Sequence, residues 1–289
     1  MGRGGTSKLT QSAKRIAHSE EREQEGKAVD PMLPALCFVW GERMDEDSVL
    51  IEPRRIPGDP GIDHPIILNL FEPYFEFLRK ELKIKKSGLK RLRFPSLNFC
   101  STSIEGRKIS VFGTPLGAPQ AALVLERLIA MGAKKVLSFG CCGSLQKDLG
   151  TGSLVVPTDA LSEEGTSAHY PLPPGKMAEA DEKITRLCLA MGGDKKFKVA
   201  AGRVWTTDAL FRETRGKTKK YSGMGLLAVE MEMSALFTVA AYRGIRLGGF
   251  MVVSDELASL TWKTGFLNPL FWLASRKATR LAVEVCLSL

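Results

Sequence analysis

The sequence predicts an α/β fold: a single domain over residues 31–289, in which a twisted, mixed central β-sheet is flanked by helices. From about residue 95 onward, short apolar segments of strand length alternate with longer segments of helical periodicity. Glycine or proline stands at several of the boundaries between them. The chain has 289 residues, 44% of them hydrophobic, which is enough for one large α/β domain or two small ones.

In the first part of this domain, the segment between the expected strand 33–40 and the expected helix 66–85 is rich in proline and charge, and we expect a long irregular connection there. A turn at Glu105-Gly106 separates two strands, and Pro119 and Gly132 mark the ends of the helix that follows them. That helix and its flanking strands form one strand–helix–strand unit with a right-handed crossover. The expected strands are 33–40, 97–102, 108–113 and 135–140, and the expected helices are 66–85 and 119–131.

The second part continues the alternation. Gly192 and Gly244 each follow a segment of helical periodicity and are expected to end a helix. The expected strands are 153–157, 198–205, 226–229 and 249–253, and the expected helices are 177–191, 234–243 and 266–289. The sheet is therefore parallel in large part, or mixed.

The composition excludes several classes of protein. Residues 1–30 are charged and lack the apolar core of a secretory signal, so we expect a mobile tail there. No segment is apolar for long enough to span a membrane. The net charge is 41 − 32 = +9, but lysine and arginine fall into short groups rather than a basic stripe with interleaved aromatics. We therefore expect no nucleic-acid partner and a preference for small anionic ligands.

The six cysteines and three histidines do not form a metal-binding pattern. No two cysteines have the Cys-x-x-Cys spacing, and the histidines are far apart in the sequence. We expect no metal site, and the reducing cytoplasm as the location.

Three carboxylates follow apolar segments that are expected to be strands. Glu230 and Glu232 lie where the strand 226–229 gives way to the helix 234–243, and Asp255 lies just past the strand 249–253. The carboxyl ends of strands are where α/β sheets bind small ligands. Because a buried charge is costly without a partner, carboxylates placed there predict a site that binds hydroxyl groups or moves a proton.

Four segments, in this order, resemble the nucleoside phosphorylase and nucleosidase superfamily, whose members include hexameric purine nucleoside phosphorylases, uridine phosphorylases and methylthioadenosine nucleosidases. The resemblance spans roughly 106–257. It rests on Gly113-Thr114-Pro115-Leu116-Gly117-Ala118-Pro119, Gly140-Cys141-Cys142-Gly143-Ser144-Leu145, Thr206-Thr207-Asp208-Ala209-Leu210-Phe211, and the pair Val229-Glu230-Met231-Glu232 and Val253-Ser254-Asp255.

The resemblance implies a role for each carboxylate. Glu232 would accept hydrogen bonds from the ribose 2′ and 3′ hydroxyls, since a carboxylate offers only acceptors. Asp255 would be the general acid at N7 of a purine. Met231 would pack on the sugar, and Glu230 would contact the ribose or hold the neighbouring backbone. Other roles stay open: a helix cap or ion pair for Glu232, a helix cap for Asp255, and core packing for Met231.

The base and the phosphate would lie on either side of the sugar. The resemblance places Thr207, Asp208, Phe211 and Arg212 at the base; the alternatives are core packing for Phe211 and a surface position for Arg212. It places Gly140, Cys141 and Gly143 at the phosphate, in a turn that follows a strand.

Two phosphate-binding arginines of the family are replaced. Ser138 stands where one is expected, and Ile62 ends a segment, Pro57-Gly58-Asp59-Pro60-Gly61, that is similar to the other. Arg54, Arg55 or an arginine of a neighbouring subunit could take their place.

The function that follows is that of a pentosyltransferase: a nucleoside phosphorylase that cleaves a ribonucleoside, with a purine base favoured over uridine, into free base and ribose 1-phosphate. Phosphate is the co-substrate and no cofactor is expected. Family members form dimers or hexamers, so we expect a homo-oligomer. Two alternatives stay open: a hydrolytic nucleosidase acting on a nucleoside or nucleotide, and a nucleoside-binding or storage protein with an inactive site.

Overall fold

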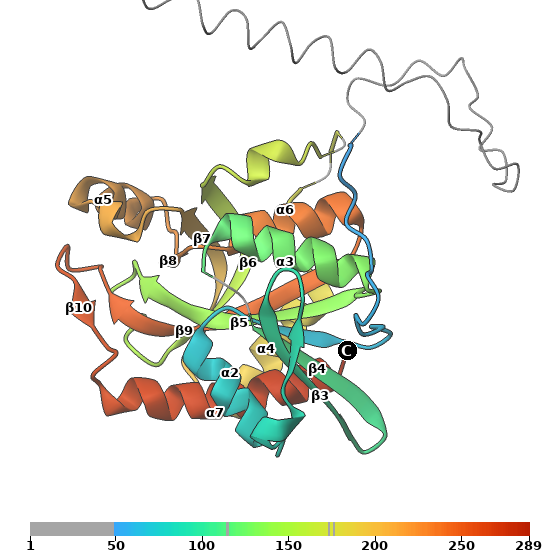
Figure 1. Cartoon of the computed structure of the whole chain (residues 1–289). Helices are drawn as coiled ribbons and strands as arrows, with labels where there is room; N and C mark the ends of the chain where they lie inside the picture. The colour runs from blue at the N-terminus through green and yellow to red at the C-terminus, as the bar shows by residue number, and fades with distance from the viewer. Residues whose placement is uncertain (1–48, 114–115, 173, 176) are drawn as a thin grey trace, which may run out of the picture. The chain divides into compact units, whose positions relative to one another are not determined.

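A computed structural model describes residues 49–113, 116–172, 174–175 and 177–289 (Figure 1). Residues from Ile51 to Leu289 form one compact unit. The predicted tail at 1–30 and the predicted strand at 33–40 lie outside the described residues. Within the described residues, no helix is both long and apolar enough to cross a membrane.

The central sheet of the described chain has ten strands in the order β10-β9-β6-β7-β8-β5-β1-β4-β3-β2. They are β1 Ile66–Asn69, β2 Lys90–Leu92, β3 Leu97–Ile104, β4 Arg107–Gly113, β5 Lys135–Ser144, β6 Leu154–Glu163, β7 Val199–Thr207, β8 Ala228–Glu230, β9 Arg246–Glu256 and β10 Lys263–Thr264. β5 is parallel to β1 and β9 but antiparallel to β8. The predicted mixed sheet is confirmed.

The sheet also closes on itself, which the sequence did not predict. β9 pairs with β6 on one side and with β5 on the other, so that β5, β9, β6, β7 and β8 form a ring. The ring has a direct consequence for function. It brings β5, β8 and β9, which carry the predicted site residues, next to one another.

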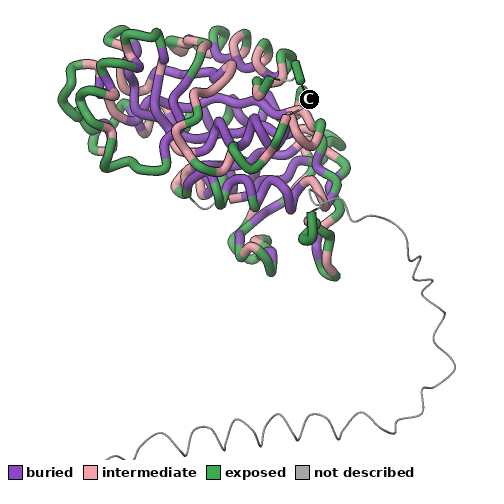
Figure 2. The backbone as a smooth tube through the Cα atoms, turned by 90° about the horizontal axis from the view of Figure 1, so that it is seen from above, coloured by how far each residue is buried: buried purple, intermediate pink, exposed green. Residues whose placement is uncertain are grey.

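Helices cover both faces of the sheet (Figure 1). They are α2 Glu72–Glu81, α3 Ala118–Ala130, α4 Glu182–Asp194, α5 Arg215–Gly223, α6 Met233–Arg243 and α7 Pro269–Leu287. α3 packs beside α6 over one face, while α7 packs against α2 and α4 over the other. Each face has its own apolar cluster, and Figure 2 shows the buried backbone running through the middle of the unit.

Several predicted elements differ from the observed ones. The helix predicted at 66–85 is a strand followed by a helix, β1 and α2, and Pro73 stands in the first turn of α2. All four residues of β1 are buried, and a short buried strand has no periodicity that distinguishes it from a buried helix. The helix predicted from residue 177 begins at Glu182, after the side chain of Asp181 caps it. β2, β10 and α5 were not predicted.

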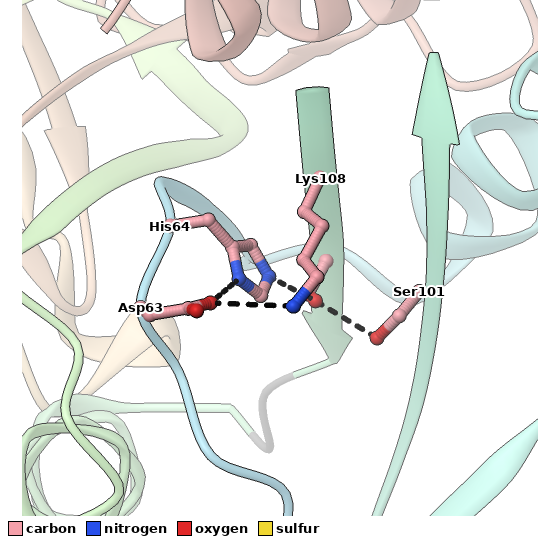
Figure 3. Close-up of polar contacts among 5 residues, drawn as sticks. Asp63, His64, Ser101 and Lys108 are labelled. Carbon is pink, nitrogen blue, oxygen red and sulfur yellow. Dashed lines mark hydrogen bonds and ion pairs between the residues drawn. The ribbon is translucent and has the colours of Figure 1, made fainter. Parts of the chain in front are cut away.

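A polar network holds the chain just before β1 against β4 (Figure 3). Asp63 bonds Nδ1 of His64 at 2.9 Å, His64 Nε2 bonds the hydroxyl of Ser110 at 2.7 Å, and that hydroxyl bonds Ser101 at 2.8 Å. The order of groups is that of a serine hydrolase relay, but Ser110 is only 2% exposed and closed to a substrate. Since Ser110 is level with Ile66, at the amino end of β1, the network anchors that end of the sheet.

Candidate active site

The site begins at Gly143 of β5, which pairs with both neighbouring strands. Gly143 is opposite Asp255 of β9 on one side and Val229 of β8 on the other. A Cβ at this glycine would lie 2.6 Å from Leu257 Cδ1 and 3.1 Å from Asp255 Oδ2. The absence of a side chain here is therefore what allows three segments to meet.

β8 runs antiparallel to β5, so the chain after Val229 turns back along Cys142 and Cys141. This direction brings Glu230 and Glu232 toward the middle of β5 rather than past its end. As predicted, Glu230 stands at the carboxyl end of β8 and Asp255 lies near that of β9. The sequence did not predict that these two strands run in opposite directions on the two sides of β5.

Glu230 is buried, and both of its oxygens are occupied by groups of the protein. The hydroxyl of Thr206 donates to Oε1, and the backbone N–H groups of Glu232 and Met233 donate to Oε2, each at 2.7 Å. Burial, opposed by these hydrogen bonds, raises the pKa of Glu230 to about 7. Two roles were expected for Glu230, contact with the ribose or support of the neighbouring backbone. Its hydrogen bonds to the backbone at the start of α6 fit the second role.

Glu232 is 5% exposed, and its Oε1 accepts the backbone N–H of Gly117 at 2.8 Å, across 115 residues of sequence. It occupies the N-cap position of α6, yet its side chain makes no capping hydrogen bond. Burial, followed by the charge of Glu230, raises the pKa of Glu232 to about 8. Gly117 has φ = 94°, a conformation that favours glycine and that aims its N–H at the carboxylate.

Asp255 lies inside β9 rather than just past it, because β9 extends to Glu256. Ser254 Oγ donates to Oδ1 at 2.6 Å and the indole Nε1–H of Trp262 donates to Oδ2 at 2.9 Å. Burial raises the pKa of Asp255, while these two hydrogen bonds oppose the rise. Its described partners are both side chains, so the contacts are not those of a helix cap.

The pKa of Cys141 is affected by the charges of two carboxylates, Asp255 and Glu232. Burial, with smaller contributions from the charges of Asp255 and Glu232, raises the pKa of its thiol to about 12, while a hydrogen bond with Ser254 opposes the rise. The thiol is therefore protonated at neutral pH and is not activated as a nucleophile. The turn predicted at Gly140–Gly143 is part of β5, which continues to Ser144 and shifts its register between Cys142 and Gly143.

The segment predicted to contact the base lies mostly at the surface. Thr207 is buried and accepts the N–H of Ala209 at 3.3 Å, whereas Asp208 is exposed and accepts the N–H of Gly165 at 3.1 Å. Arg212 is exposed, and the ring of Phe211 is 96% exposed. The ring therefore does not line an enclosed pocket within a single chain.

Glu213, next in the sequence, lies closer to the site. Burial raises its pKa to about 7, and the charge of Asp255 contributes to the rise. Met231, predicted to pack on the sugar, is partly exposed between Glu230 and Glu232.

The similarity of residues 57–62 to a phosphate-binding segment is accidental. Asp59 is buried and forms an ion pair with Arg127 at 2.6 Å, and the N–H of Ile62 donates to Met131, just past the end of α3. Gly117, beside Glu232, caps the opposite end of that helix. At 1.5 Å per residue, the length of α3 separates Ile62 from Gly117, and so from Glu232, by about 20 Å. Arg55 donates to the carbonyl of Asp59 at 3.1 Å, and Arg54 is exposed.

Ser138 is buried and occupied by the core. Its hydroxyl donates to Met233 Sδ at 3.4 Å and to the carbonyl of Gly248 at 3.3 Å. A Cβ on Gly249 would lie 2.1 Å from Ser138. The packing leaves no space for an arginine side chain at this position.

Sequence reasoning missed Gly117 and Trp262 as neighbours of the carboxylates. The contact of Glu232 with Gly117 spans 115 residues, and no local pattern encodes it. The contact of Asp255 with Trp262 spans 7 residues, and the unpredicted pairing of β10 with β9 creates it. Within the described residues, no cluster of histidine, cysteine, aspartate or glutamate could hold a metal ion.

Comparison with known proteins shows the family of the chain. The family model described as the phosphorylase superfamily matches residues 71–283. A guanosine phosphorylase of Halorubrum lacusprofundi is 30% identical over 214 residues, which cover 74% of this chain and 82% of the relative. A DeoD-type purine nucleoside phosphorylase of Bacillus cereus is 31% identical over 163 residues, 56% of this chain and 68% of the relative. The chain belongs to the phosphorylase superfamily.

A solved structure has the same fold. The uridine phosphorylase of Vibrio fischeri ES114 superposes with a TM-score of 0.67, covering 79% of this chain and 93% of the other, at 22% sequence identity. The expected fold and the expected superfamily are confirmed.

Proposed function

We propose that the protein is a nucleoside phosphorylase that transfers the ribosyl group of a purine ribonucleoside to phosphate and releases the free base. One observation carries the proposal: β8 and β9 pair with β5 on its two sides, which brings Glu232, just after β8, and Asp255, in β9, to the same part of β5. The charges of both carboxylates raise the pKa of Cys141 in that strand. The names of the relatives, guanosine phosphorylase and purine nucleoside phosphorylase, support the same reaction. Inorganic phosphate is the co-substrate, and the reaction needs no organic cofactor.

Glu232 would hold the ribose. Its carboxylate offers acceptors to the two donors of a vicinal diol. Burial and the charge of Glu230 raise its pKa to about 8, so it is largely protonated at neutral pH. Hydrogen bonds donated by the diol stabilise the charged form. The negative charge would then stabilise the sugar as it becomes cationic in the transition state.

Asp255 would protonate the leaving base. Its raised pKa favours the protonated form that a general acid needs, and such catalysis contributes about 10²–10⁴-fold. N7 exists only in purines, which is why Asp255 favours a purine substrate over uridine. Glu230 would act indirectly, by fixing the backbone that carries Glu232.

A second candidate, hydrolysis by water, is favoured by one observation. Among the described residues, the charged groups that act on Cys141, Glu232, Asp255 and Glu213 are all acidic. Phosphate is an anion and gains nothing from such surroundings. Water carries no charge and would meet no such repulsion.

The test is base release from a panel of nucleosides and nucleotides, with and without phosphate. Release that depends on phosphate and yields ribose 1-phosphate supports phosphorolysis, and release without it supports hydrolysis. Glu232→Gln is expected to lower kcat/KM by on the order of 10²-fold or more, as when one charge-stabilising group is removed from a site. Glu182→Gln, at an exposed glutamate of α4, is the matched control. Binding without release from any substrate would contradict both reactions.

We also propose a homo-oligomer, a dimer or hexamer, in the cytoplasm. The resemblance to the family supports assembly, and the nearly complete exposure of Phe211 is consistent with a contact that a second copy would cover. The five described cysteines are all free, as expected in a reducing compartment. A monomer by light scattering would contradict the assembly.

A further inference from the structure

Trp262 makes an unusual contact for an exposed residue. Its indole Nε1–H donates to Asp255 Oδ2 at 2.9 Å, although the residue is 67% exposed. The contact is fixed by the backbone, because β10 pairs antiparallel with β9 and places Lys263 opposite Glu256 and Thr264 opposite Asp255. Trp262 immediately precedes this pairing. The hairpin therefore holds the indole over the carboxyl group.

We propose that Trp262 is both the positioning residue of Asp255 and the surface on which the nucleobase stacks. This inference rests on the proposed function, since it gives Asp255 the role of the acid. The indole N–H is a donor only, so it can hold one carboxyl oxygen but never take the proton that Asp255 delivers. Ser254 holds the other oxygen, and two donors on two oxygens fix the plane of the carboxyl group.

The exposed area of the indole supplies the second part of the role. Tryptophan is a large apolar residue that is highly buried on average. Here the polar edge is held at Asp255 while the ring remains open to solvent. A flat base that brings its N7 to Asp255 would lie beside this ring. Stacking on an aromatic ring is sequence-tolerant and adds affinity for any base.

Phe211 gives the site a second exposed ring. It lies in the short helix Leu210–Arg212, directly before Glu213, whose pKa responds to the charge of Asp255. Two segments near Asp255 thus each present an aromatic ring, one 96% and the other 67% exposed. Of these two rings, that of Trp262 has the hydrogen bond to Asp255, so it is the ring that couples base binding to proton transfer.

The first test needs no substrate. Tryptophan fluorescence is followed from pH 3 to 9 in the wild-type chain and in Trp262→Phe, Asp255→Asn and Trp272→Phe. We expect a fluorescence step in the wild type as Asp255 titrates, and its loss in Trp262→Phe and in Asp255→Asn. Trp272→Phe is the matched control and keeps the step, because Trp272 donates to the carbonyl of Phe266 instead. A step that persists in Trp262→Phe, or none in the wild type, overturns the contact.

The second test separates positioning from stacking. Trp262→Phe retains a ring but loses the donor, so we expect an unchanged KM for the nucleoside. Because the lost hydrogen bond lowers the pKa of Asp255, the alkaline limb of the kcat profile should move to higher pH. Trp262→Ala loses both, and KM should rise roughly tenfold. Equal KM values for the two variants would overturn the stacking role, and an unmoved alkaline limb would overturn the positioning role. If the wild type cleaves no nucleoside, the proposed function fails, while the fluorescence result stands.

Discussion

Replacing Gly143 by alanine tests whether close packing of three strands sets the geometry of the site. The added Cβ would lie 2.6 Å from Leu257 Cδ1, 3.1 Å from Asp255 Oδ2 and 3.2 Å from Val229 Cγ1. Carbon atoms in contact lie about 3.5–4.0 Å apart, so Leu257 must move by about 1 Å. Leu257 is buried in a small apolar cluster with Leu145 and Val229 and has little space to do so.

The expected cost follows from these distances. Overpacking of this size destabilises a core by about 1–3 kcal/mol, and each kcal/mol lowers Tm by about 2–4 °C in a chain of this size. Asp255 is pushed along with Leu257, and a misplacement of about 1 Å can lower the rate by about 10²-fold. We therefore expect Gly143→Ala to lose both stability and kcat, as measured by thermal unfolding and base release.

Gly193→Ala is the matched control for this substitution. Gly193 lies in α4 with no atom within 4 Å of the added Cβ, so alanine should be neutral or stabilising by up to about 1 kcal/mol. The reasoning is refuted if Gly143→Ala has the Tm and the kcat of the wild type. A lower Tm with full activity would show that Asp255 does not depend on this packing.

Three further predictions concern charged residues. Asp255→Asn should slow cleavage of purine nucleosides more than that of uridine, with the exposed Asp148→Asn as control; equal losses would indicate a structural role. The pKa of Glu232 is raised from 4.5 to about 8 in the folded chain, so the folded state binds the extra proton and its stability should fall as pH rises from about 4.5 through 8. Tm measured across that range should fall less steeply in Glu232→Gln, and an identical slope would contradict the raised pKa. Asp59→Asn leaves Arg127 buried without its partner and should cost about 3–5 kcal/mol in urea unfolding without changing KM; an altered KM would place this pair at the site.

Much of the fold could be predicted because its signals are local. β3, β4 and α3 lie within two residues of the predicted boundaries, and the turn at Glu105-Gly106 has positive φ at both residues. Gly244 ends α6 in the left-handed conformation, as its position after the helical segment predicts. The family resemblance was also readable, since its four motifs are short and continuous.

The errors fall where local signals are ambiguous or absent. β1 was predicted as part of a helix because its four residues are all buried, and so short an apolar segment shows neither the period of a helix nor that of a strand. β10 has two residues, too few for any pattern.

The sequence by itself determined the class of fold, the superfamily and the two carboxylates, Glu232 and Asp255, on which the proposed function rests. Only the tertiary structure decided how they are used. The packing of α3 beside α6 brings Gly117 to Glu232, and the pairing of β10 with β9 brings Trp262 to Asp255. These contacts depend on which strands pair, and pairing is chosen by the packing of the whole chain, because each strand offers the same backbone donors and acceptors to any neighbour.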